Sequence, residues 1–146
     1  MKSQAYLDLK KKQEKEFSEF PIAYAFNGKQ LEEALEKLGA KDVSECTTVF
    51  NHGDIVKKEN APKLIALFER HNVEMHEALK DEDFAEGAFL YEMNNHEYAI
   101  NWDGDDDVLG CFALSFEKLK EMGLEDAYRR ARKEHMRLAH EEWEMI

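Results

Sequence analysis

Apolar residues recur at intervals of three and four positions along most of this 146-residue chain. This spacing places them on one face of an α-helix, so it predicts amphipathic helices that pack against one another. A first helix is expected before Pro21, and a long last helix at about 124–143. The longest purely apolar run, 22–26, has five residues, whereas a membrane-spanning helix needs roughly 20. The N-terminus also lacks an apolar stretch of signal-peptide length, so we expect a cytoplasmic protein without a membrane segment.

Local signals divide the chain into helices and short strands. Asn27 is suited to cap a helix that Gly39 ends, and Asp83 is expected to cap another helix at 84–93. The acidic sequence 103–107 is typical of a turn. Four strands are predicted, at 22–26, 47–51, 54–58 and 96–102. The sequence therefore predicts a single α+β domain over 1–146, with five or six helices covering a small mixed, mostly antiparallel sheet.

Negative charge is concentrated in one stretch of the chain. The 20 Lys and Arg and 32 Asp and Glu residues give a net charge of −12. Residues 81–107, which we call the acidic segment, contain ten acids and no Lys or Arg. Such a segment repels DNA and anionic membranes, and it attracts basic surfaces.

Several runs of this sequence resemble a known protein family. They are FPIAYAFNGKQLEEALEKLG at 20–39, FLYEMNNHEYAINWD at 89–103 and VLGCFALSFEKL at 108–119, and the most distinctive part is YEMNNHEY. Together they resemble a family of small proteins of unknown function from gut Gram-positive bacteria, their phages and their mobile elements. The resemblance covers roughly residues 1–120. It implies a mobile-element setting and supplies no catalytic residues. The acidic turn and the long last helix depart from the family's pattern, so this chain's own function could lie there.

These features favour a non-enzymatic acidic binding protein of phage or mobile-element origin. A groove that binds phosphates will accept carboxylates held at similar spacing. The expected partner is therefore a basic, nucleic-acid-binding protein surface, which the chain would occupy as anti-CRISPR and other DNA-mimic inhibitors do. The chain itself is expected to bind neither nucleic acid nor membrane. The expected partner-binding residues are Asp81, Glu82, Asp83, Glu86, Asp103, Asp105, Asp106 and Asp107.

Two other functions stay open. A small metal-assisted hydrolase would use His96 together with Glu92 or Asp103. A structural or regulatory homo-oligomer would join its copies through the C-terminal helix. Its apolar contact residues would be Trp143, Met145 and Ile146.

The basic residues of the last helix suggest an alternative to an exposed acidic surface. Basic residues between Arg129 and Arg137 could lie across the acidic segment and neutralise it within the molecule.

The sequence indicates no cofactor and no metal site. Residues 103–107 have acids at positions 1, 3 and 5 of a calcium loop. However, Val108 and Leu114 stand where an EF-hand requires glycine and glutamate. The six histidines form no ligand set, and Cys46 and Cys111 match no zinc spacing. No catalytic residue is therefore assigned.

Overall fold

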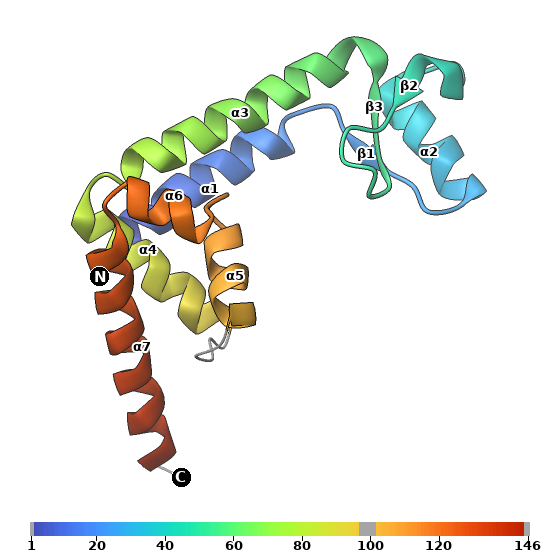
Figure 1. The fold of residues 1–146 in the computed structure, drawn as a ribbon. Helices are drawn as coiled ribbons and strands as arrows, with labels where there is room; N and C mark the ends of the chain where they lie inside the picture. Colours follow the sequence, from blue (N-terminus) through green and yellow to red (C-terminus); the bar gives the residue numbers. More distant parts are fainter. Residues whose placement is uncertain (1, 97–101, 145–146) are drawn as a thin grey trace. The chain divides into compact units, whose positions relative to one another are not determined.

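The computed structural model describes residues 2–96 and 102–144, apart from the side chains of 102, 103, 143 and 144 (Figure 1). The chain divides into two compact units. The helical unit comprises Met1–Lys11 and Asn72–Ile146, and the sheet unit comprises Lys12–His71. Two helices, α1 (Gln4–Ser18) and α3 (Ala61–Ala78), contribute residues to both units. The single α+β domain stays a prediction.

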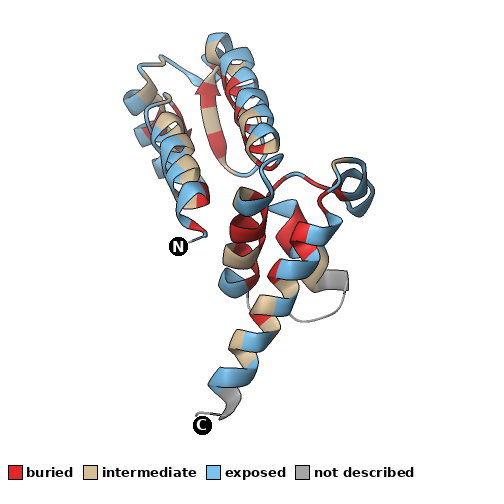
Figure 2. Cartoon of the chain, turned by 90° about the vertical axis from the view of Figure 1, so that its left-hand side faces the viewer, coloured by how far each residue is buried: buried red, intermediate tan, exposed pale blue. Residues whose placement is uncertain are grey.

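The sheet unit is built around a small antiparallel sheet. Its strands are β1 (Ala23–Tyr24), β2 (Cys46–Thr47) and β3 (Asp54–Lys57), in the order β1-β3-β2. Residues along β3 alternate between buried and half-buried, as the burial colours of Figure 2 show. The core of this unit contains Ile22, Val56, Leu64 and Leu67.

The signals at the ends of α2 (Gly28–Leu38) act as predicted. The Asn27 side chain accepts a hydrogen bond from the backbone N–H of Gln30, at 2.8 Å. Gly39 follows the helix with a φ of 70°, a left-handed conformation that glycine adopts without steric cost. Two short 3₁₀-helices, η1 (Val43–Glu45) and η2 (Lys58–Asn60), flank the hairpin strands.

The helical unit packs around α4 (Glu82–Asn95), whose buried residues include Ala85, Ala88, Phe89 and Met93. α7 (Glu125–Glu144) lies beside α4 (Figure 1), and its buried residues include the small Ala127 and Ala131. α5 (Trp102–Gly110) and α6 (Phe116–Glu121) complete this unit. α7 closely matches the long last helix predicted at about 124–143.

The structure corrects the predicted strand and helix counts. The described residues form three strands rather than four, all antiparallel, and seven α-helices rather than five or six. The predicted α+β class agrees with the structure, because the chain is mostly helical and also contains a small sheet. The fourth strand was predicted at 96–102, of which 97–101 lie outside the described residues. At its two ends, His96 caps α4 and Trp102 begins α5.

Two local predictions in the acidic segment are also wrong. Residues 103–107 belong to α5 and form no turn. Carboxylates interact favourably with the positive end of the helix dipole, so an acidic run at the start of α5 suits a helix. Asp81, and not Asp83, caps α4 by accepting a hydrogen bond from the backbone N–H of Phe84. No helix in the part of the chain that the structure describes is long and apolar enough to cross a membrane.

Candidate functional site

The predicted partner-binding acids divide into exposed and enclosed groups. The exposed acids lie at the start of α4 and in α5. They are Asp81, Glu82, Asp83, Asp106 and Asp107. We refer to these five residues as the exposed acidic residues. The side chain of Asp103 lies outside the described residues.

Glu86 is buried and ion-paired, which corrects its assignment to a docking surface. Its carboxylate lies 3.1 Å from Lys2 Nζ and 3.1 Å from Arg130 Nε. Burial alone would raise the pKa of Glu86, but the hydrogen bonds and charges of Lys2 and Arg130 outweigh burial and lower it. Glu86 therefore stabilises the packing of α4 against α7. Asp105 is half-buried and accepts a hydrogen bond from the Tyr128 hydroxyl at 2.6 Å.

The arginines of α7 neutralise part of the acidic segment. Arg130 reaches across to Glu86 and to Glu82, with a nitrogen–oxygen distance of 3.9 Å to Glu82. Arg129 and Arg137 pair instead with acids of α7 itself: Asp126, Glu134 and Glu141. Ion pairs between α7 and the acidic segment thus join Arg130 to Glu82 and Glu86.

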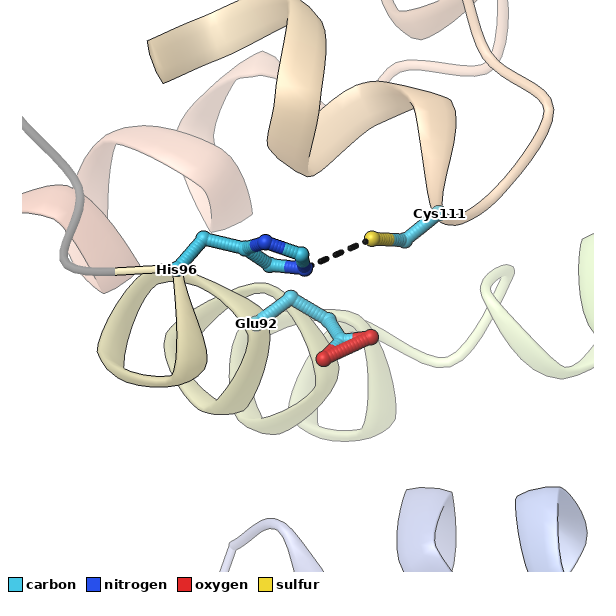
Figure 3. Close-up of side chains that lie close together, drawn as sticks. All are labelled: Glu92, His96 and Cys111. Carbon is cyan, nitrogen blue, oxygen red and sulfur yellow. Dashed lines mark hydrogen bonds between the residues drawn. The ribbon is translucent and has the colours of Figure 1, made fainter.

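A second group of chemically reactive side chains lies where α4 ends and α5 ends. Glu92 and His96 are four residues apart, so the helix places them on the same face. Cys111 directly follows α5, and its Sγ lies 3.3 Å from His96 Nε2 (Figure 3). One donor atom of each residue lies within 4.8 Å of the other two. We call these three residues the Glu–His–Cys cluster, and they are the described residues of this unit best placed to hold a metal.

The N-terminal helix closes one side of this cluster. The Tyr6 hydroxyl donates a hydrogen bond to Glu92 Oε2 at 2.7 Å, and Lys10 Nζ lies 3.5 Å from the same oxygen. Burial and the neighbouring Glu92 carboxylate raise the pKa of Tyr6, so the phenol stays protonated and keeps donating. Glu92 is only 2% exposed.

Cys111 is a protonated thiol at neutral pH. Desolvation of the sulfur and the neighbouring Glu92 carboxylate raise the pKa of Cys111 to about 11. A nucleophilic cysteine needs the opposite shift, which a cationic partner or a helix N-terminus produces. The Cys111–His96 contact therefore lacks the electrostatics of an activated thiolate.

The pairing of Glu92 with His96 was predicted as part of the hydrolase alternative. Its other proposed carboxylate, Asp103, has its side chain outside the described residues. Cys111 was missed, because it is fifteen residues from His96 and no sequence spacing relates the two. Glu92 and His96 are four residues apart, which a helix would place on one face. The sequence did not show this relation because His96 was predicted to begin a strand at 96–102.

The chain belongs to a family of proteins of unknown function. That family is DUF7659, whose model matches residues 5–134. No curated protein and no solved structure matches the chain. The predicted resemblance to a family of unknown function is thereby confirmed, while the origin in gut bacteria, phages or mobile elements stays a prediction.

Proposed function

We propose that this chain is a non-enzymatic, acidic binding protein that docks on a basic surface of another protein through the exposed acidic residues. The helical unit contains 11 Lys and Arg against 21 Asp and Glu residues, so it carries −10 of the net charge of −12. The sheet unit carries the remaining −2. This asymmetry creates a negative potential that attracts a basic partner and repels nucleic acid.

The observation that carries the proposal is the pairing of the α7 arginines. Had they all lain over the acidic segment, little negative potential would remain. Instead Arg129 and Arg137 pair with acids of their own helix, and Arg130 pairs with Glu82 and the buried Glu86. Asp83, Asp106 and Asp107 are exposed, and their charge supports docking.

The partner proposed is a nucleic-acid-binding protein, since such proteins present clustered Lys and Arg that evolved to bind phosphates. In its finer form, the chain is a DNA-mimic inhibitor of phage or mobile-element origin, comparable to anti-CRISPR proteins. That finer form rests on charge alone.

The test compares two variants that lose three carboxylates each. Asp81→Asn, Glu82→Gln and Asp83→Asn together neutralise the start of α4, and asparagine preserves the cap at position 81. Glu32→Gln, Glu33→Gln and Glu36→Gln together remove the same charge from exposed positions of α2 in the sheet unit. Each immobilised protein is incubated with bacterial lysate at low salt and eluted with rising salt.

We expect the wild-type protein and the α2 variant to retain a basic nucleic-acid-binding protein from the lysate. The α4 variant should not retain it. The purified partner should bind at least tenfold more weakly at 300 mM than at 50 mM salt, an order-of-magnitude expectation from counterion screening. Adding the chain should also displace a labelled DNA duplex from that partner. Equal retention by the two variants, an affinity that is flat with salt, or no captured basic protein would each refute the proposal.

A further inference from the structure

The Glu–His–Cys cluster brings together three of the side-chain types that most often ligate transition metals. Figure 3 shows the imidazole of His96 pointing at the Cys111 sulfur, with the Glu92 carboxylate beside them. All three residues belong to the helical unit, and two of them are fixed by α4. His96 is held at the end of that helix, where its backbone N–H donates to the Glu92 carbonyl at 3.0 Å.

An independent observation shows that the cluster is incomplete as a hydrogen-bonded group. Glu92 Oε2 is contacted by Tyr6 and Lys10, but the other oxygen, Oε1, has no nitrogen or oxygen donor among the described residues, and the neighbouring Cys111 thiol is only a weak donor to this carboxylate. Its carboxylate is almost wholly buried. An ionised oxygen that is removed from water and left unpaired is costly, and such exceptions in a folded protein need a physical explanation.

We infer that Glu92, His96 and Cys111 bind a divalent cation of the zinc class. A cation between the three donor atoms would ligate Glu92 Oε1 and thereby compensate its burial. Zinc accepts sulfur, nitrogen and oxygen ligands in one tetrahedral site. Calcium and magnesium are excluded as preferred ions, because they select oxygen ligands and disfavour sulfur.

The spacing of the sulfur and nitrogen donor atoms is close to that of two ligands on one tetrahedral ion. Zinc–sulfur and zinc–nitrogen bonds at tetrahedral angles place those two ligand atoms roughly 3.5 Å apart. Cys111 Sγ and His96 Nε2 lie 3.3 Å apart. Small rotations of these two exposed side chains would open that distance, whereas the buried Glu92 side chain stays fixed by Tyr6.

Binding is a ligand exchange with a defined proton balance. The protonated thiol of Cys111 loses its proton to the solvent as the sulfur–metal bond forms, which a coordinated zinc ion readily drives. No redox change takes place. The exposure of His96 and Cys111 gives the ion a path from solvent. It also leaves the fourth position to water, the arrangement of zinc sites with three protein ligands.

The test titrates the full chain with Zn²⁺ by calorimetry and with Co²⁺ by absorption spectroscopy. Two variants remove ligands at exposed positions where folding is expected to tolerate them, Cys111→Ser and His96→Asn. The matched controls are Cys46→Ala, which removes the other thiol, and His52→Asn, which removes an exposed imidazole of the sheet unit. Circular dichroism checks the fold of each protein.

We expect one ion per chain in wild type and both controls. The affinity for the ion should be at least about 100-fold weaker in each ligand variant, because replacing even a residue that only supports a metal ligand lowers metal affinity by about 10- to 100-fold. The Co²⁺ complex of wild type should show a thiolate charge-transfer band that Cys111→Ser abolishes. No saturable Zn²⁺ binding would leave the cluster as a hydrogen-bonded group only. Equal affinity in all five proteins would place the ion on carboxylates elsewhere. Either result overturns the inference, which stands or falls independently of the docking proposal.

Discussion

Asp54 fixes the turn between β2 and β3, and its replacement by asparagine should destabilise the sheet unit. Its Oδ1 accepts hydrogen bonds from the Thr48 hydroxyl at 2.9 Å and the His52 backbone N–H at 3.1 Å. Its Oδ2 accepts from the backbone N–H groups of Val49 and Phe50, at 2.8 and 3.1 Å. Asparagine keeps one acceptor oxygen, but its NH₂ group replaces Oδ2. An NH₂ group cannot accept the hydrogen bonds that the N–H groups of Val49 and Phe50 donate to Oδ2.

The pKa of Asp54 gives the size of this effect. Burial alone would raise the pKa, but the backbone donors Phe50, Val49 and His52 and the Thr48 hydroxyl outweigh burial and lower it from 3.8 to about 2. A shift of this size corresponds to about 2 kcal/mol of stability in favour of the ionised form. Since the folded-state pKa is depressed, this stability is fully present above the unfolded pKa and is lost as pH falls through the folded pKa. At pH 3 about half should remain.

The assay is urea unfolding of wild type and Asp54→Asn at pH 7 and pH 3, followed by amide NMR signals of residues 46–57. At pH 7 the variant should lose about 2 kcal/mol or more, and at pH 3 the difference should shrink by about 1 kcal/mol. Glu59→Gln, an exposed change in the same unit, should cost less than about 0.5 kcal/mol at both values. A penalty for Asp54→Asn that is independent of pH would refute the assignment of the effect to the ionised carboxylate.

Two further changes test the packing of the helical unit. In Gly87→Ala the added Cβ would lie 2.1 Å from the Lys2 carbonyl oxygen, so we expect a loss of about 1–3 kcal/mol by thermal unfolding. The control Gly110→Ala, which meets no atom within 4 Å, should be neutral or stabilising, and equal effects at the two glycines would contradict the close approach. Tyr6→Phe removes the hydroxyl that donates to the buried Glu92 carboxylate, and urea unfolding should register a loss of about 1–2 kcal/mol. An unchanged midpoint would show that this hydrogen bond contributes nothing.

Local signals in the sequence predicted those elements whose ends are set by local chemistry. The cap at Asn27 and the stop at Gly39 depend on side chains and backbone angles within a few residues, so both could be placed without the fold. Residues 103–107 show the opposite case. Aspartate and glycine favour turns, but the same aspartates stabilise the start of a helix, and only the packing of α5 against α4 decides between the two.

The candidate site residues also divide into those that the sequence could predict and those that it could not. Exposed acids of the acidic segment follow from composition, since charged residues are rarely buried. The exception, Glu86, could not be recognised, because its partners Lys2 and Arg130 are distant along the chain. Cys111 likewise reaches His96 only because α5 ends beside the end of α4. Contacts between residues far apart in sequence carry no periodic signal, so they appear only with the tertiary structure.

The two buried carboxylates of the acidic segment also differ in how their charge is compensated. Glu86 has a cation at each oxygen, Lys2 at Oε1 and Arg130 at Oε2. Glu92 has Tyr6 and Lys10 on Oε2 alone, and it is the more deeply buried of the two. A carboxylate in that position needs positive charge on its second side, because the attraction of one neighbouring ammonium at 3.5 Å competes with the loss of hydration. One oxygen of this carboxylate lies within 4.8 Å of the His96 nitrogen and the Cys111 sulfur, which are donor types that bind a metal ion. The unpaired oxygen of Glu92 is therefore the difference between the two carboxylates that the proposed cation would remove.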